Sequence, residues 1–195
     1  MPTHPKIVAF AGSAREGSHN VRLLALAVRA ARAAGAEVTE VSMRDFPMPL
    51  YDAELEAKEG LPEPVRRFKA LLEGSDGFLI ASPEYNSSIT PLLKNAIDWA
   101  SRPEGKGPAL TAFRGKAAAL FAASPGSLGG LRGLVHLRAI LGNIGVLVLA
   151  DQVAIPSAHQ AFAPDGALAD IGAGKRVAAL AEALVDLVRR LAARG

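Results

Sequence analysis

Short apolar runs alternate with amphipathic segments along the whole chain, and this alternation limits the possible folds more than any other feature. The predicted strands are residues 6–11, 37–43, 77–82, 116–123 and 146–150, the last with an extension that reaches 155. The predicted helices are residues 20–34, 63–73, 90–101, 131–141 and 173–193. Strands that alternate with helices predict a parallel sheet with right-handed crossovers and helices on both faces.

The number of predicted strands favours one fold class. We expect a single α/β domain over residues 1–195, a flavodoxin-like three-layer sandwich whose five-stranded parallel sheet has the order 2-1-3-4-5. A six-stranded dinucleotide-binding fold would need a further strand. The stretches at 45–62, 102–111 and 156–172 are predicted to be loops, and the last of them carries no motif.

Composition excludes several classes of protein. A chain with 50% apolar and 21% charged residues is globular, and without cysteine it has no disulfide, thiol nucleophile or thiolate metal site. The four histidines lack the spacing of metal ligands, so no metal is expected. A net charge of +3 suits an anionic ligand, but no basic run typical of nucleic-acid binding is present. With no signal pattern and no apolar stretch of roughly 20 residues, a cytoplasmic protein that does not enter a membrane is expected.

Three loops follow the first, third and fourth predicted strands. They are Gly12–Asn20, Pro83–Ser88 and Ser124–Gly130, and all are rich in serine, glycine or asparagine. In an open parallel sheet, the loops at the carboxyl ends of these strands converge where the strand order reverses. We therefore expect the binding site at this edge.

The first loop has the chemistry of an anion site. Its hydroxyls, Arg15 and the free N–H groups of the following helix suit a phosphate. Gly12 and Gly17 have the spacing of a P-loop, but Ser18-His19 stands where Lys-Ser/Thr is required, so a monophosphate fits better than a nucleoside triphosphate. The alternative is that the serines are ordinary turn and cap residues.

The second and third loops suit a flat ligand. Pro83 takes the chain out of the sheet, and Tyr85 could then lie on an aromatic ring, although an exposed tyrosine in a loop is more often a plain surface residue. Gly126, Gly129 and Gly130 allow the backbone to approach a ligand closely, or form a tight turn before a helix.

Three motifs together resemble the NADPH-dependent FMN reductase family, which includes quinone, chromate and azo-compound reductases. The motifs are Gly12-Ser13-x-Arg15-x-x-Ser18-x-Asn20, Pro83-Glu84-Tyr85-Asn86-x-Ser88 and Leu93-Lys94-Asn95-x-Ile97-Asp98-Trp99. The Pro-Glu-Tyr-Asn segment is specific, whereas the glycine turn at Ser124 is much less so. One departure is Thr90-Pro91, where many relatives have Pro-Gly.

The resemblance implies a flavin site. Ser13, Arg15, Ser18 and Asn20 would hold the FMN phosphate; Pro83, Glu84, Tyr85 and Asn86 would line the isoalloxazine and ribityl chain; Ser124, Gly126 and Gly129 would cover another ring edge. His19 and Ser88 complete the cofactor-binding set. No catalytic residue is expected, because the cofactor passes a hydride from NADPH or NADH to a small-molecule acceptor. A homodimer or homotetramer is implied, with the helix of Asp98 and Trp99 near the subunit contact, unless Trp99 is a core residue.

Other functions remain open from the sequence. A flavodoxin-type electron carrier would also bind FMN, but such carriers are usually acidic and this chain is net basic. A nucleotide-binding α/β protein lacks support, because neither a P-loop lysine nor a GxGxxG is present. A family member that has become a binding or regulatory module is a third alternative. The sequence does not name the physiological acceptor.

Overall fold

The computed structural model describes residues 4–193 and contains the predicted parallel sheet, in the order β2-β1-β3-β4-β5. The strands are β1 (Lys6–Ala11), β2 (Glu37–Val41), β3 (Gly77–Ala81), β4 (Ala117–Ala123) and β5 (Leu147–Ile155). The helices are α1 (His19–Ala33), α2 (Ala53–Glu59), α3 (Glu63–Glu73), α4 (Pro91–Ala100), α5 (Leu131–Asn143) and α6 (Ile171–Ala192), with a 3-10 turn at Met43–Asp45. The predicted fold class and strand order are confirmed.

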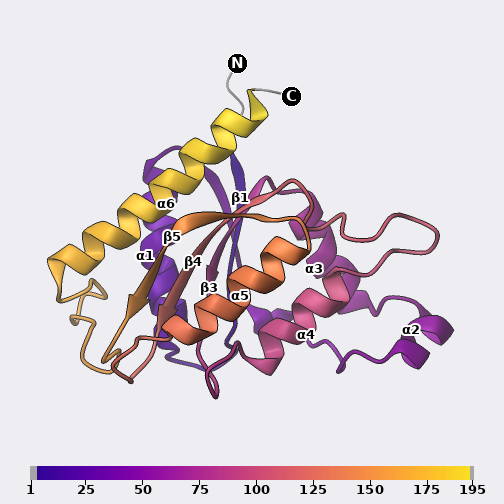
Figure 1. Ribbon diagram of the computed structural model, residues 1–195, viewed down its shortest axis with the longest axis horizontal. Helices are drawn as coiled ribbons and strands as arrows, with labels where there is room; N and C mark the ends of the chain where they lie inside the picture. The colour runs from indigo at the N-terminus through magenta and orange to yellow at the C-terminus, as the bar shows by residue number, and fades with distance from the viewer. Residues whose placement is uncertain (1–3, 194–195) are drawn as a thin grey trace.

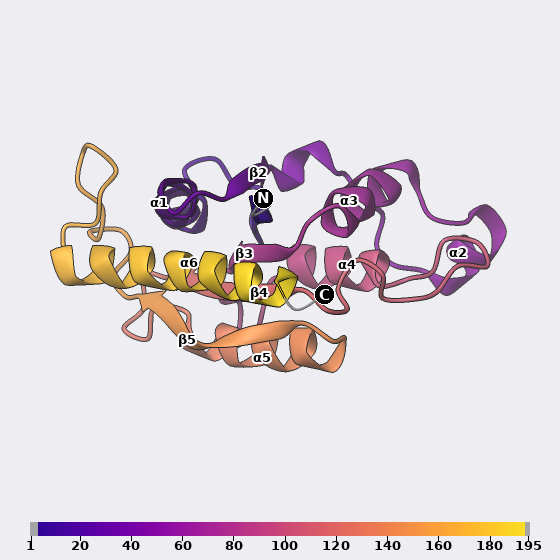
Figure 2. The ribbon, with the colours of Figure 1, turned by 90° about the horizontal axis from the view of Figure 1, so that it is seen from above.

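Helices cover both faces of the sheet, as the alternation predicts. Helices α1 and α6 lie on one face, and α3, α4 and α5 lie on the other (Figures 1 and 2). Successive strand residues point to opposite faces, so Ile7 and Ala9 pack with the first pair of helices, whereas Val8 and Phe10 pack with the second group.

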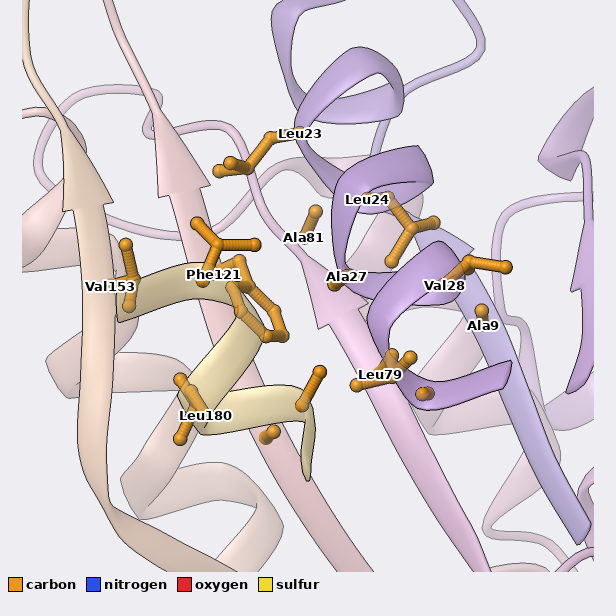
Figure 3. Packing of buried hydrophobic residues seen from close by; sticks show 14 of the residues in the cluster. Ala9, Leu23, Leu24, Ala27, Val28, Leu79, Ala81, Phe121, Val153 and Leu180 are labelled. Carbon is orange, nitrogen blue, oxygen red and sulfur yellow. The ribbon is translucent and has the colours of Figure 1, made fainter. Parts of the chain in front are cut away.

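The core under α1 and α6 is built from small and branched side chains. Figure 3 shows Leu23, Leu24, Ala27 and Val28 of α1 above the sheet, with Leu180 of α6 beside Phe121 of β4. The many alanines of this face let the helices approach the strands closely. This packing fixes the start of α1 over the carboxyl ends of β1, β3 and β4.

The stretch at residues 45–62, predicted to be a loop, contains a helix. Helix α2 is only seven residues long and has no buried residue. It forms because the Asp52 carboxylate caps it, accepting from the N–H groups of Glu54 at 2.7 Å and Leu55 at 3.1 Å. Its apolar spacing is too weak to stand out between the prolines and Gly60.

Trp99 is a core residue of this chain. Its side chain is fully buried with Leu61 and Val65, and its indole N–H donates to the Pro49 carbonyl at 2.8 Å. Tyr51 contacts its ring edge-on at 4.9 Å. The Trp99 face of α4 is thus covered within the chain, whereas Asp98 on another face pairs with Lys94 at 2.7 Å.

The amino ends and the carboxyl ends of the parallel strands lie on opposite sides of the molecule, called the amino edge and the carboxyl edge here. At the amino edge, β1 begins with Lys6, whose N–H donates to Asp76 at 2.8 Å, and the last turn of α6 lies beside the same region. At the carboxyl edge, the three predicted loops meet. Within residues 4–193, no helix is long and apolar enough to cross a membrane.

Residues 156–170 join β5 to α6 and are called the strap below. The strap contains local structure. Phe162 and Leu168 form an antiparallel bridge, and Leu168 is buried against the α1–α6 core. Helix α6 begins two residues before its predicted start, because the Asp170 side chain accepts from the Ala173 N–H at 3.1 Å.

Candidate functional site

The three loops form one open cavity of about 310 Å3 at the carboxyl edge of the sheet. Most of the predicted site residues line it: Ser13, Arg15, Ser18, His19, Asn20, Pro83, Glu84, Tyr85 and Ser124. Ala123 and Pro125 also line it and were not predicted. Asn86, Ser88, Gly126 and Gly129 lie in the same loops but outside the lining. The three loops therefore converge as the strand order predicts, but fewer of their residues line the cavity than were predicted to bind the cofactor.

The first loop is held tightly against the end of β3. The Gly12 N–H donates to the Ala81 carbonyl at 2.9 Å, and the Thr90 hydroxyl donates to the Gly12 carbonyl at 2.7 Å. A Cβ on Gly12 would meet Leu93 Cβ at 3.0 Å and Thr90 Oγ1 at 3.1 Å, so there is no room for a side chain. Thr90, the departure from the family pattern, thus both caps α4 and anchors the loop.

The start of α1 is open to an anion. Ser18 is its N-cap residue and is buried, yet its hydroxyl makes no cap bond to the helix. The first N–H groups of a helix have no intrahelical acceptor, and the helix dipole favours negative charge there. Arg15 is exposed at the mouth of the cavity. These groups can bind a phosphate.

Asn20 joins two of the loops. Its side-chain amide donates to the Ala123 carbonyl at 2.8 Å, and its carbonyl oxygen accepts from the Ala123 N–H at 2.9 Å. Both ends of this buried side chain are therefore engaged at the end of β4. The contact with a phosphate that was predicted for Asn20 stays a prediction, and it would be made by the backbone N–H alone.

Glu84 extends its carboxylate to α5. It accepts from Arg132 Nε at 2.8 Å and from the Gly133 N–H at 3.1 Å, and its side chain is 8% exposed. Burial alone would raise its pKa, but the Arg132 guanidinium and the Gly133 N–H together lower the pKa of Glu84 below its ordinary value. Since the N-cap of α5 is Gly130, which has no side chain, Glu84 supplies the cap. Only the stem of Glu84 remains to line a ligand.

A two-residue hairpin carries Tyr85 beyond the sheet. The N–H groups and carbonyls of Tyr85 and Ser88 pair at 2.9 and 3.0 Å, and the residues between them, Asn86 and Ser87, have φ values of 49° and 67°. This is the geometry of a type I′ turn. Tyr85 is 56% exposed, which leaves its ring available to a flat ligand. Ser88 bonds with His136 Nδ1 at 2.9 Å and so helps fix the hairpin on α5.

The third loop packs against β5 through its glycines. A Cβ on Gly129, which has a φ of 63°, would come within 2.7 Å of the Ile155 backbone. Gly129 therefore lets the loop approach β5, and it does not face the cavity. The Ser124 hydroxyl accepts from the Gly126 N–H at 3.3 Å and lies on the cavity wall.

His19 is half-buried at the phosphate end of the cavity. Burial, and then the charges of Arg15, Arg22 and His159, lower its pKa below the ordinary value. Phe162 of the strap stacks on its ring, a contact for which the sequence offers no signal. No group of histidine and carboxylate side chains within the described part of the chain is arranged to hold a metal ion.

The sequence matches a known protein family and several of its relatives. Residues 5–160 match the family model described as NADPH-dependent FMN reductase. The chain is 38% identical over 188 residues to an NAD(P)H-dependent FMN reductase of Pseudomonas aeruginosa, covering 95% of this chain and 96% of the relative. It is 37% identical to an NAD(P)H:quinone oxidoreductase of Solanum tuberosum, with coverage of 95% and 94%.

Solved structures give the same result. FerB of Paracoccus denitrificans, a flavoenzyme NAD(P)H:acceptor oxidoreductase, superposes with a TM-score of 0.80 at 32% identity, over 95% of this chain and 98% of FerB. An archaeal flavodoxin superposes with a TM-score of 0.64 at 11% identity, which supports the fold alone. The chain belongs to the NADPH-dependent FMN reductase family.

Proposed function

We propose that this protein is an FMN-dependent NAD(P)H oxidoreductase that reduces a quinone, a flavin or a similar small acceptor. The observation that carries the proposal is the meeting of an anion-binding loop and an exposed aromatic hairpin at one cavity. FMN has the matching parts, a phosphate at one end and a flat ring at the other. The family and the relatives' names support the same activity.

The phosphate end of FMN fits the start of α1. Ser13 and Ser18 offer hydroxyls, Arg15 offers a charged donor, and the first turn of the helix offers N–H groups. His19 adds a half-buried imidazole ring to the lining at this end of the cavity. The absence of a P-loop lysine agrees with a monoester, which needs no group to reach a β- or γ-phosphate.

The ring end fits the hairpin. When bound, FMN would supply the redox chemistry, accepting a hydride from a reduced nicotinamide and passing it to the acceptor. Tyr85 would border the ring, and the backbone of the Pro83–Ser88 and Ser124–Gly130 loops would hold its polar edge. The Glu84–Arg132 pair keeps the hairpin fixed on α5, so the ring site is preorganised. No side-chain acid or base is required, so substrates of different shapes can use one open face.

Two wider properties belong to the same proposal. A cytoplasmic location suits a chain with no cysteine. A homodimer or homotetramer suits the exposed large apolar side chains Leu50, Val135 and Ile171, since such side chains often mark contacts between subunits.

A spectroscopic experiment tests the proposal. The purified protein is mixed with FMN, freed of excess, and its visible spectrum is recorded before and after anaerobic NADPH or NADH. We expect bound flavin that bleaches with reduced nicotinamide and recovers on addition of a quinone. Failure to bind FMN would exclude a flavin enzyme, and binding without bleaching would favour an electron carrier.

A further inference from the structure

The strap is fastened beside the phosphate end of the cavity. The Ala158 N–H donates to the Ser124 carbonyl at 3.0 Å, which ties the strap to the third loop. Farther along, the Ala163 N–H donates to the Ala167 carbonyl at 2.9 Å, closing a turn that presents Phe162 to α1. The strap thus reaches the first helix from the far edge of the sheet.

Phe162 contacts two basic side chains on one ridge of α1. Its ring stacks on His19 with centroids 6.2 Å apart and planes 9° apart. The Arg22 guanidinium, three residues along the same helix, lies 4.3 Å from the centre of the Phe162 ring. The stack fixes the plane of the His19 ring, which lines the cavity together with Ser18 and Arg15.

The His19 ring has an unused nitrogen. Within residues 4–193, Nδ1 of His19 is the one buried side-chain nitrogen or oxygen without a hydrogen-bond partner. Such a group is costly in a folded protein and usually has a functional explanation. Nδ1 is shielded from solvent, so an anion in the cavity would act on this ring through its charge and not through a bond to Nδ1.

The charged groups that act on the His19 ring are all basic. Arg15 lies in the first loop, Arg22 on α1 and His159 on the strap, and all three oppose protonation of the ring. Glu84 also lines the cavity, and its carboxylate is paired with Arg132 of α5. Burial and these charges therefore favour the neutral form of the ring, and a phosphate dianion in the cavity would oppose them.

We propose that His19, positioned by Phe162, takes up one proton from solvent when the phosphate of FMN enters the cavity, so that affinity for the phosphorylated flavin falls as the pH rises. This inference rests on the proposed flavin function. The proton adds a charged donor at the site that binds the phosphate, and Phe162 is a positioning residue that acts through the ring. The strap, for which the sequence offers no role, thereby sets the pH response of cofactor binding.

The test compares FMN with riboflavin, which lacks the phosphate, on the purified full chain stripped of flavin. Dissociation constants are measured by flavin fluorescence from pH 5.5 to 8.5, and calorimetry in two buffers of different ionisation enthalpy counts the protons taken up. Variants are His19→Gln, Phe162→Leu and, as a matched control, His4→Gln, which changes a histidine that does not line the cavity. The second ionisation of the phosphate, near pH 6, affects every variant alike and cancels in the comparison.

In the range where the ring changes its charge on binding, we expect the wild type to lose FMN affinity by up to about tenfold per pH unit relative to His19→Gln. Proton uptake should differ by up to about one between these two proteins. Phe162→Leu should weaken the pH dependence, His4→Gln should keep it, and riboflavin should show none of it. An NMR titration of the His19 ring in the wild type, with and without FMN, gives the same answer without relying on a variant.

Equal proton counts in the wild type and His19→Gln, or a His19 ring that titrates alike with and without FMN, would overturn the inference. The inference would also be overturned if His4→Gln lost the pH dependence as His19→Gln does. If FMN binds and NADPH bleaches it while these differences are absent, the inference alone has failed. If the wild type binds no FMN, the proposed function has failed with it.

Discussion

Asn20 and Ala123 exchange two hydrogen bonds, at 2.8 and 2.9 Å, and so join the first turn of α1 to the last residue of β4. The pair is buried and lies directly beneath the phosphate end of the cavity. It shows that one of the family's motif residues serves the shape of the site through its side chain.

Replacement Asn20→Ala is expected to lower the free energy of unfolding by about 2–4 kcal/mol, because it leaves the buried Ala123 N–H and carbonyl unpaired. Urea denaturation followed by circular dichroism measures the loss. Ser127→Ala, an exposed change in the third loop, is the control and should have little effect. Equal stability of the two variants would show that the Asn20 amide is dispensable.

Arg15→Ala should weaken FMN binding by about 10–100-fold, the loss of a charge-assisted hydrogen bond to phosphate, and should leave riboflavin almost unaffected. Fluorescence titration with the two flavins measures both constants. Arg44→Ala is the matched control, because Arg44 binds the same loop through the Ala14 carbonyl and Glu16 but does not line the cavity. Similar losses for both flavins would remove Arg15 from the phosphate site.

Tyr85→Ala should weaken FMN binding by about 2–10-fold or slow bleaching by NADPH, since the ring would lose an aromatic contact. Tyr85→Phe keeps the ring and should behave like the wild type. Stopped-flow absorbance separates binding from reduction. Unchanged behaviour of Tyr85→Ala in both would mean that Tyr85 is a plain surface residue.

Ser87→Val should lower the free energy of unfolding by about 1–2 kcal/mol, because Ser87 has a φ of 67° and a β-branched side chain is strained there. Ser87→Gly is the matched variant. Because glycine adopts a positive φ without strain, its free energy of unfolding should differ from that of the wild type only by a small entropic cost. Thermal denaturation compares the three proteins. If valine is tolerated as well as glycine, the hairpin adopts another turn in solution.

The variant Glu84→Gln should lose less of its free energy of unfolding in acid than the wild type does. The pKa of Glu84 is lowered in the folded protein, so its contribution is present above the unfolded pKa of about 4.3 and is lost as the pH falls through the folded pKa. The stability of the wild type should therefore fall more steeply below about pH 4.5 than that of the variant. Denaturant titrations from pH 3 to 7 test this, with exposed Glu182→Gln as the control. Parallel curves for wild type and Glu84→Gln would contradict the prediction.

The sheet could be predicted from the sequence because each buried parallel strand is a short apolar run with a glycine or proline near its end. Helix α3 has the predicted bounds, since Pro62 and Gly74 mark both of its ends. Helix α2 was missed because it is short and buries nothing. The position of the cavity followed from the strand order alone.

Side-chain directions within the site could not be predicted. Glu84 points to Arg132, a partner 48 residues away, and no local pattern records such a pair. The side chain of Asn20 binds the backbone of Ala123, and any residue at position 123 would present the same N–H and carbonyl groups. The sequence therefore carries no sign of this pair, and from the sequence Asn20 is interpreted as a phosphate ligand. Phe162 stands in a stretch without periodicity, and only the folded chain brings it to His19.

The placement of β1's first residue and α6's last turn at the amino edge has a practical consequence. Lys6 lies beside Asp76, and Leu191 lines the same region, whereas the cavity formed by the three loops lies at the opposite ends of the strands. A tether fused to either of these elements would pull on the side of the molecule remote from this cavity. The protein could thus be immobilised on an electrode or a resin with the cavity toward the solution.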